Sequence, residues 1–358
     1  MAIPAPAPHN APIRVMVVED SIMMRSAIRK ILGDDPEIDL AATANNGQEA
    51  LDKLANQNFD VVILDIEMPI MDGLTALPKI VKVSPGIQVI ISSALTMKGA
   101  AISLEALSLG AADYITKPNA AMGADVFGQY LKAKIKSLGR AAIARKQQKK
   151  QFVGSPRLVS IQKSFQAQCL AIGSSTGGPQ ALPILLRALG PQTSYPIFIT
   201  QHMPPAFTAI LAEHLEQASG MPTREGKDGE EVAPGRIYVA PGNFHMLIEQ
   251  KSGNRVIRLS QDAPENFCRP AVDPMLRSLA NTYKGKVLTV ILTGMGHDGT
   301  AGMKILSEQG GLAIAQDEQS SVVWGMPGAL VQAGLASAIL PLQNIAAQAQ
   351  KYLPGGRP

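Results

Sequence analysis

The sequence predicts an α/β protein with two doubly wound parallel-sheet domains, the second larger than the first. The chain has 358 residues, which is enough for two or three domains of ordinary size. Short apolar runs alternate with segments of helical periodicity, first over residues 13–137 and again over residues 168–353. Because parallel strands need crossover connections, which are usually helices, this alternation favours parallel sheets with helices on both faces.

The first segment opens with a strand-like apolar run at residues 13–18, and the helix pattern after it stops at Gly33 and Pro36. Further apolar runs, separated by helix-like segments, occur at residues 38–42, 61–65, 89–91 and 114–115. We therefore expect one α/β domain over residues 13–137, preceded by a disordered tail over residues 1–12.

The second segment repeats this pattern on a larger scale, and we expect a single domain over residues 168–353. Its expected strands are residues 169–173, 196–200, 236–240, 256–259, 287–293 and 312–315. Its expected helices are residues 178–189, 205–219, 273–283, 299–309 and 327–333.

A basic linker is expected between the two domains, over residues 138–167. No carboxylate occurs between Asp125 and Glu213, whereas that interval holds eleven Lys and Arg, eight of them between Lys132 and Lys150. Three interpretations remain open: a solvated linker face, a surface for an acidic protein partner, or a nucleic-acid site. The absence of interleaved aromatic residues makes the nucleic-acid interpretation the weakest.

Composition excludes several classes of protein. Hydrophobic residues make up 46% and charged residues 17% of the chain, so it can form globular cores. Its two cysteines cannot build a disulfide framework, and no Cys/His cluster suggests zinc. The N-terminus lacks the features of a signal peptide, and no run approaches the roughly 18 apolar residues of a membrane span. We expect a cytoplasmic protein that does not insert into membranes.

Polar residues follow the expected strands of the first domain. Glu19 and Asp20 come after the first strand, Asp65 ends the third, Ser93 follows the fourth and Lys117 the fifth. Ligands bind at this edge of open α/β sheets. Three carboxylates there suit Mg²⁺, and a hydroxyl with an ammonium group suits a phosphoryl group. Each acid alone would more simply cap a strand or a helix, but the full set predicts a phosphoryl site.

These residues lie in strings that resemble the receiver domain of response regulators. The strings are VVEDSIMMR, ILDIEMPIMDGL, IISSALT and ADYITKP. The resemblance implies a flavodoxin-like (βα)5 fold and phosphorylation of Asp65 by a histidine kinase. It also implies further roles: Mg²⁺ held by Glu19, Asp20 and Asp65; phosphoryl contacts from Ser93 and Lys117; a shift of Tyr114 on activation; and a cis bond before Pro118.

A serine in the second domain is a candidate nucleophile. The string IGSSTGG follows an expected strand, precedes an expected helix and satisfies G-x-S-x-G with Ser175 at its centre. Small flanking residues permit the sharp turn that exposes a nucleophilic hydroxyl. A phosphate-binding loop or a plain tight turn remains an alternative for this string alone.

A nucleophilic serine needs a base and an acid that orients it. His202 and His297 both lie at expected strand ends, so either could be the base, and Asp298 is the natural orienting acid. The resulting order, Ser…His…Asp, differs from the Ser…Asp…His order of common α/β-hydrolases. This difference counts against an ordinary esterase or lipase.

The second domain resembles the catalytic domain of the CheB family of protein-glutamate methylesterases. The strings are AIGSSTGG, ITQHMP, IYVAPGNFHM, CRPAVDPM, LTGMGHDGTAGM and AQDEQSSVVWGMP. The resemblance implies Ser175 as nucleophile, His202 as base and Asp298 as orienting acid. It also makes the backbone amides around Thr176 and Met295 candidates for an oxyanion hole. His297 occupies a position where this family often has Asn.

The resemblance implies a phosphorylation-activated hydrolase that removes methyl esters from glutamates of chemoreceptors, releases methanol and deamidates glutamines. The implied partners are chemoreceptors and a histidine kinase, with no nucleic acid, and the ester chemistry needs no cofactor. Two alternatives are a binding protein with an inactive hydrolase fold and a DNA-binding response regulator. The complete Ser175, His202 and Asp298 set opposes the first, and the size of the second domain opposes the other.

Overall fold

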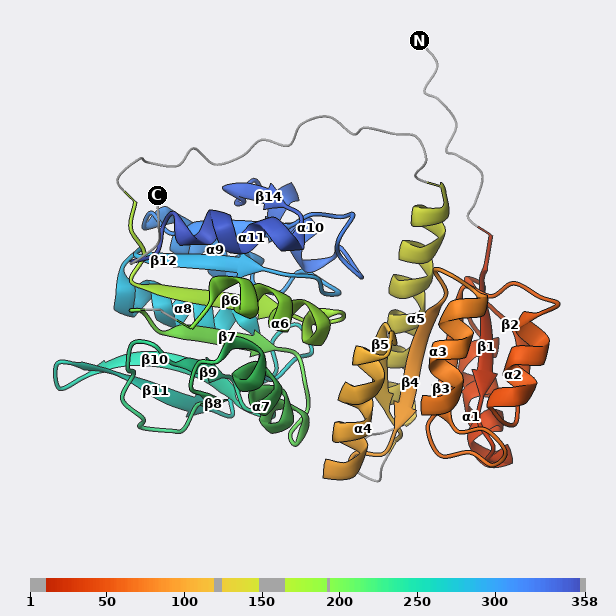
Figure 1. Ribbon diagram of the computed structural model, residues 1–358. Coiled ribbons are helices and arrows are strands. Elements are labelled where there is room, and N and C mark those ends of the chain that lie inside the picture. Colours follow the sequence, from red (N-terminus) through yellow and green to blue (C-terminus); the bar gives the residue numbers. More distant parts are fainter. Residues whose placement is uncertain (1–10, 119–123, 148–164, 192–193, 355–358) are drawn as a thin grey trace, which may run out of the picture. The chain divides into compact units, whose positions relative to one another are not determined.

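The computed structural model describes residues 11–118, 124–147, 165–191 and 194–354. The chain divides into two compact units, each with its own parallel sheet (Figure 1). Most of the expected tail and the larger part of the expected linker lie outside the described residues. No helix in the described part of the chain is long and apolar enough to cross a membrane.

The first unit has a five-stranded parallel sheet in the order β2-β1-β3-β4-β5. Its strands are β1 (Ile13–Val18), β2 (Ile38–Ala44), β3 (Val61–Asp65), β4 (Gln88–Ser93) and β5 (Asp113–Thr116). Both faces are covered, which explains why the central strands are continuous apolar runs. The order reverses between β1 and β3, and ligands of such sheets bind at this point.

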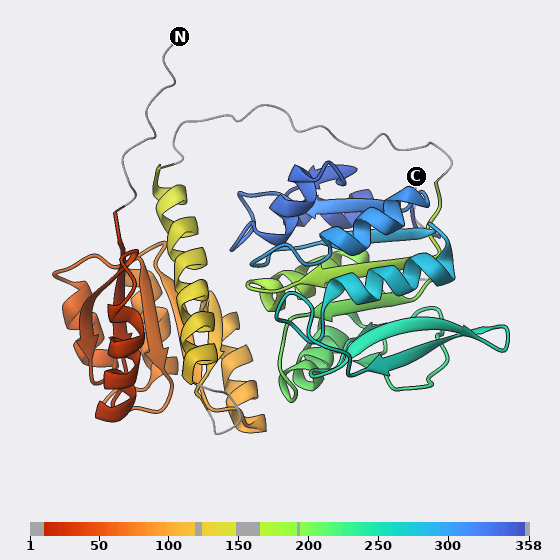
Figure 2. The ribbon, with the colours of Figure 1, turned by 180° about the vertical axis from the view of Figure 1, so that it is seen from behind.

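Five helices cover this sheet. They are α1 (Ile22–Gly33), α2 (Gly47–Leu54), α3 (Gly73–Val83), α4 (Met97–Ser108) and α5 (Ala124–Gln147). Helices α2, α3 and α4 lie on one face (Figure 1), whereas α1 and α5 lie on the other (Figure 2). Side-chain caps at Ser21, Asn46 and Asp72 start α1, α2 and α3. Helix α5 runs to Gln147, so the first part of the expected linker is helical.

The second unit has a seven-stranded parallel sheet in the order β14-β13-β12-β6-β7-β9-β8. Its strands are β6 (Cys169–Ser174), β7 (Ile197–Gln201), β8 (Thr223–Glu225), β9 (Ile237–Val239), β12 (Val287–Ile291), β13 (Leu312–Gln316) and β14 (Ala338–Leu340). The order reverses between β6 and β12, which makes that edge the expected ligand position.

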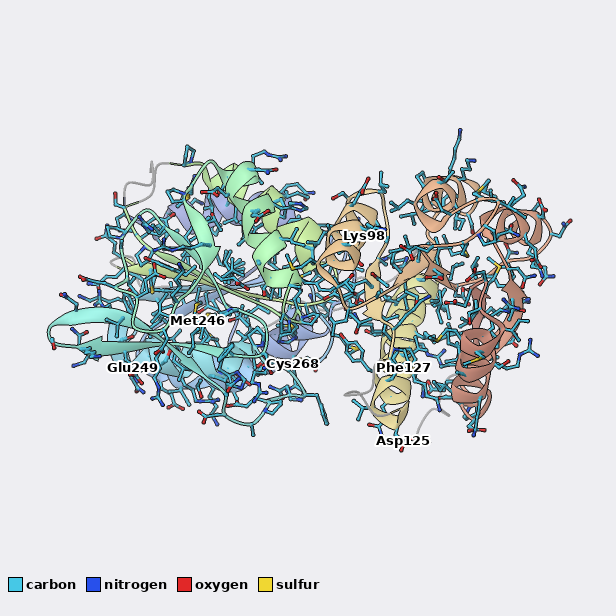
Figure 3. The ribbon with its side chains drawn as sticks, turned by 90° about the horizontal axis from the view of Figure 1, so that it is seen from below. Lys98, Asp125, Phe127, Met246, Glu249 and Cys268 are labelled. Carbon is cyan, nitrogen blue, oxygen red and sulfur yellow. The ribbon has the colours of Figure 1, made fainter. Side chains whose placement is uncertain are left out.

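A separate antiparallel hairpin is formed by β10 (His245–Lys251) and β11 (Asn254–Ser260). The strand expected at residues 256–259 lies in this hairpin and not in the parallel sheet. Met246 of β10 is fully buried in the interior of the unit, whereas Glu249 lies near its edge (Figure 3). The hairpin thus adds its own apolar face to the core of the second unit.

Six helices complete the second unit. They are α6 (Gly178–Leu189), α7 (Phe207–Ser219), α8 (Val272–Tyr283), α9 (Thr300–Glu308), α10 (Met326–Gln332) and α11 (Leu342–Gln350). Helices α6, α7 and α11 pack together on one face of the sheet (Figure 1), and α8 packs with α9 on the other (Figure 2). Helix α10 contacts α9, β12 and β13.

One backbone expectation is wrong. The only cis peptide bond in the described parts of the chain joins Arg269 and Pro270, so the bond between Lys117 and Pro118 is not cis.

Candidate functional site

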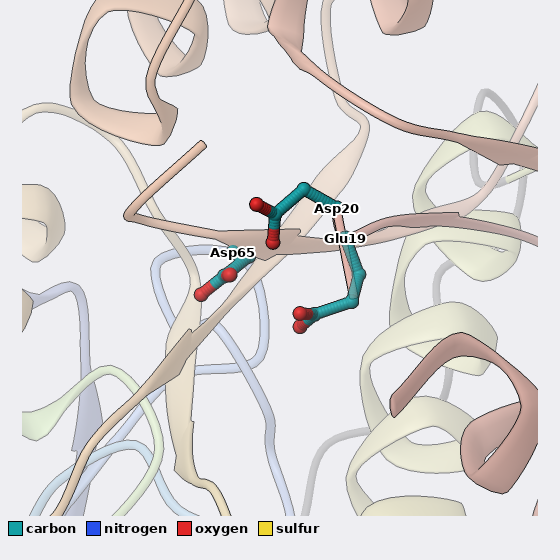
Figure 4. A group of neighbouring side chains, drawn as sticks. All are labelled: Glu19, Asp20 and Asp65. Carbon is teal, nitrogen blue, oxygen red and sulfur yellow. The ribbon is translucent and has the colours of Figure 1, made fainter. Parts of the chain in front are cut away.

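The acids expected at the edge of the first sheet lie together. Glu19 and Asp20 follow β1 and Asp65 ends β3, at the point where the strand order reverses (Figure 4). One carboxylate oxygen from each lies within 4.8 Å of the others. Glu19 and Asp65 are buried, whereas Asp20 is exposed.

The electrostatics of this cluster suit an added cation. Burial and the neighbouring Asp65 raise the pKa of Glu19, although Lys117 opposes the shift. The Lys117 ammonium lies 2.8 Å from Oδ2 of Asp65 and 3.1 Å from Oε2 of Glu19. A single ammonium thus only partly offsets three carboxylates, and their oxygens are the ligands that Mg²⁺ prefers. The donor set fits a magnesium ion.

Two further predicted residues lie near this edge. Ser93 is buried at the end of β4, whose Ser92 pairs with Asp65. Tyr114 on β5 is buried, and the ammonium of Lys134 lies 5.3 Å from its ring centre. Lys134 is itself buried in an ion pair with Asp113. Sequence reasoning missed this pair, because a lysine in a basic run gives no sign that it faces inward.

In the second unit, the pairing of two neighbouring strands places Ser175 and His202 side by side in the backbone. Ser174 of β6 is the register partner of Gln201 of β7, and Ser175 and His202 are the next residues. The His202 N–H donates to the Ser174 carbonyl at 3.1 Å. Both residues therefore leave the sheet at the same edge and at the same level.

Two glycines shape the turn that carries Ser175. Gly177 has a φ of +82°, a backbone conformation that glycine adopts without strain. A Cβ on Gly178 would lie 1.9 Å from Oε1 of Gln201. That same Gln201 accepts a hydrogen bond from the Ser174 hydroxyl at 2.7 Å and donates one to the Ser175 carbonyl at 2.9 Å. The turn leaves no room for a larger residue.

We expect Gly178→Ala to lower the free energy of unfolding by about 1–3 kcal/mol, because the new methyl group must displace the Gln201 side chain. Thermal unfolding of the full chain measures this effect. Gly33→Ala is the control, since a Cβ there meets nothing within 4 Å. Equal stability of the two variants would contradict the prediction.

Asp298 lies in the loop after β12 and accepts hydrogen bonds from several groups. Nε2 of His202 lies 2.7 Å from its Oδ2. The backbone N–H groups of Val272, Asp273 and Gly299 donate to it at 2.6, 3.0 and 2.9 Å. The first two belong to the first turn of α8, so the positive end of the helix dipole stabilises the carboxylate. Asp298 is thus held as a buried anion beside the imidazole.

The pKa values of His202 and Asp298 shift in opposite directions. Burial raises the pKa of Asp298, but the hydrogen bond and charge of His202 and the two α8 amides lower it to about 2. Burial lowers the pKa of His202, but Cys268 and Asp298 outweigh this effect and raise it to about 10. The site therefore favours an imidazolium next to a carboxylate.

The other residues that the sequence predicted for this site are Thr176, Met295 and His297, and they differ in burial. Thr176 is buried, and its carbonyl accepts a hydrogen bond from the Thr293 hydroxyl at 2.9 Å. Met295 is half-buried in the loop after β12, and the adjacent Gly294 packs against Ser175. His297 is exposed. Of the two candidate bases, His202 is the one that contacts Asp298.

Sequence reasoning missed several residues that support this site. Asn266 donates to Asp298 Oδ1 and to Asp273 Oδ2, both at 3.1 Å. Asp273 accepts from the Gly302 N–H at 2.6 Å, and burial, opposed by that hydrogen bond but aided by Asp298, raises its pKa to about 6. Cys268 contributes to the raised pKa of His202. Cys268 and Asp273 both stand in the string CRPAVDPM, which was the available signal.

The two units define a class of protein: one α/β unit places Ser175, His202 and Asp298 at one edge of its parallel sheet, and the other carries an acidic cluster at the edge of a five-stranded parallel sheet. Comparison with known proteins is more specific. Residues 170–349 match the CheB methylesterase family, and residues 15–123 match the response regulator receiver domain. The chain belongs to the CheB methylesterase family, as the sequence predicted.

Relatives cover nearly the whole chain. A protein-glutamate methylesterase/protein-glutamine glutaminase of Azospirillum brasilense is 48% identical over 98% of this chain and 96% of its own length. A second one, from Paramagnetospirillum magneticum, is 50% identical over 97% of each. The crystal structure of the Thermotoga maritima CheB methylesterase catalytic domain is 42% identical, with a TM-score of 0.50 over 51% of this chain and 97% of that one.

Proposed function

We propose that this chain hydrolyses methyl esters on glutamate side chains of chemoreceptors, deamidates receptor glutamines, and is activated by phosphorylation of Asp65. The observation that carries the catalytic part is the His202–Asp298 pair, held at the level where Ser175 leaves the neighbouring strand. We place the receiver domain at residues 13–137, the linker at 138–167 and the catalytic domain at 168–353. We also propose that the protein acts in the cytoplasm.

In the proposed mechanism, Ser175 attacks the carbonyl carbon of the ester. Asp298 engages Nε2 of His202, which leaves Nδ1 to accept the serine proton. The backbone N–H groups of Thr176 and Met295 stabilise the oxyanion. His202 then donates the proton to methanol, and water that it deprotonates releases the glutamate carboxylate from the acyl-serine.

In the receiver domain, Glu19, Asp20 and Asp65 would hold Mg²⁺, which neutralises charge as the phosphoryl group is transferred. Asp65 accepts the phosphoryl group from a histidine kinase. Its present neighbour Lys117 then pairs with a phosphoryl oxygen, together with Ser93. Tyr114, which packs beneath Lys134, rearranges in response.

The proposal is tested with receptor-containing membranes that carry labelled methyl groups. The full chain with a small phosphodonor and Mg²⁺ should release labelled methanol, and Ser175→Ala should release none. If the native chain leaves the label on the receptors, and also fails to hydrolyse a small glutamate methyl ester, the proposed function is wrong.

Asp298→Asn is expected to move the acid limb of kcat/KM to lower pH while lowering its plateau. His202 must be neutral to accept a proton, so a raised pKa makes activity increase with pH. Removing the carboxylate charge removes one cause of that raised pKa. The measurement is hydrolysis of a small glutamate methyl ester over about pH 6–11, with the uncatalysed rate subtracted.

The control for this profile is Asp228→Asn, because Asp228 is exposed and accepts a hydrogen bond from the Leu259 N–H of the hairpin. Its acid limb should stay where the native limb lies. An unmoved limb in Asp298→Asn would mean that Asp298 does not set the protonation of the base.

A further inference from the structure

A strained tight turn stands beside the catalytic pair. Glu265 and Cys268 exchange backbone hydrogen bonds of 3.1 and 2.8 Å, and Asn266 and Phe267 form the tip between them. Both tip residues have positive φ, +51° for Asn266 and +62° for Phe267. Asn is common at the first position of such a turn, but the second position favours Gly, and a bulky residue there is a conformational outlier.

The turn is hydrogen-bonded to Asp298 before its tip and lies near His202 after it. Before Phe267, the Asn266 side chain donates to Asp298 at 3.1 Å. After Phe267, Cys268 lies close enough to His202 to contribute to its raised pKa. At its base, Glu265 forms an ion pair with Arg277 of α8. Since consecutive Cα atoms are about 3.8 Å apart, Phe267 lies at the rim of the site that these residues define.

Phe267 is exposed to 102% of its reference area, the highest value among the exposed large hydrophobic residues of the described chain. Its backbone strain costs stability, and its exposed ring gains none from burial. Residues in strained backbone conformations cluster at active sites and ligand clamps. The exposed, strained Phe267 is therefore a candidate ligand contact.

We propose that Phe267 is a specificity-determining contact for the polypeptide substrate: its ring packs on apolar side chains that flank the modified glutamate. This inference rests on the proposed function. The substrate is the occupant that the geometry favours, because Asn266 ties the turn to Asp298, which itself pairs with His202. A polypeptide segment that presents its ester to Ser175 must pass close to Phe267, whereas a small ester need not.

The test is Phe267→Gly in the full chain with phosphodonor, measured on methyl-labelled receptor membranes and on a small glutamate methyl ester. Glycine removes both the ring and the backbone strain. We expect kcat/KM on receptors to fall on the order of 10- to 100-fold, with the small ester hydrolysed at the native rate. The thermal unfolding temperature should rise or stay constant, so lost folding cannot explain the result. Phe267→Leu should retain most receptor activity.

Ile305→Ala is the matched control, because Ile305 is an exposed apolar residue of α9 (38%) and should tolerate the change on both substrates. Native receptor activity in Phe267→Gly would overturn the inference. Equal losses on both substrates would also overturn it, because the turn would then serve to position His202 and Asp298. A changed oligomeric state would overturn it as well, because the ring would then contact a second copy of the chain. If the native chain hydrolyses neither substrate, the proposed function fails first.

Discussion

Ser175→Ala is expected to lower kcat for ester hydrolysis by on the order of 10⁴–10⁶-fold, and His202→Ala should lower kcat to a similar residual value. The double variant should be no worse than either single one. The reason is that the serine attacks only as its proton is accepted, so each residue without the other contributes little. The backbone turn and the oxyanion amides remain in all three variants and set the residual rate.

The measurement is kcat on a small glutamate methyl ester, with folding checked by thermal unfolding. His297→Ala is the matched control, since this histidine is exposed and lies next to Asp298 in sequence; it should retain activity near the native value. If His297→Ala were inactive and His202→Ala active, the base would be His297. Additive losses in the double variant would mean that Ser175 and His202 act in separate steps.

Asp65→Asn is expected to abolish both acid-labile phosphorylation by a small phosphodonor and the activation that phosphorylation brings. An amide at this position cannot form the acyl phosphate, whereas the other two acids of the cluster should serve only the metal. For allosteric coupling of ordinary size, the lost activation corresponds to roughly 5- to 150-fold in activity. Labelled phosphodonor and methanol release measure the two effects on the same samples.

Asp72→Asn is the control for this substitution. Asp72 is exposed and caps α3 by accepting from the Thr75 N–H at 2.7 Å, and asparagine caps helices equally well. Glu19→Gln should weaken Mg²⁺ binding but leave the phosphoacceptor Asp65 in place. Undiminished labelling of Asp65→Asn would show that another residue receives the phosphoryl group.

The sequence predicted the parallel-sheet folds well because buried strands and amphipathic helices leave strong patterns. Helix α6 has the bounds that its periodicity predicted, residues 178–189. Short β8 and β14, with three residues each, are too brief to show a period, and α11 was not anticipated. The pattern of residues 256–259 indicated a strand correctly, but a short apolar run does not reveal whether its partner is parallel or antiparallel.

The positions of the candidate residues were predictable where a residue ends a strand, as Asp65 does, or directly follows one, as Ser175 and His202 do. Supporting residues were not, because their roles depend on contacts between distant segments. Asn266 reaches Asp298 only after the loop before α8 has packed against the loop after β12. Similarly, nothing local in the sequence indicates that Gln201 holds the Ser175 turn.

The hydrogen bonds from α8 to Asp298 give the molecule an internal reporter. The amide protons of Val272 and Asp273 are held by the carboxylate of Asp298, which we propose orients the base. They can exchange with solvent only when this carboxylate moves away or α8 frays at its first turn. Hydrogen–deuterium exchange at these two amides therefore measures how often the Asp298 carboxylate leaves them, without substrate and independently of turnover.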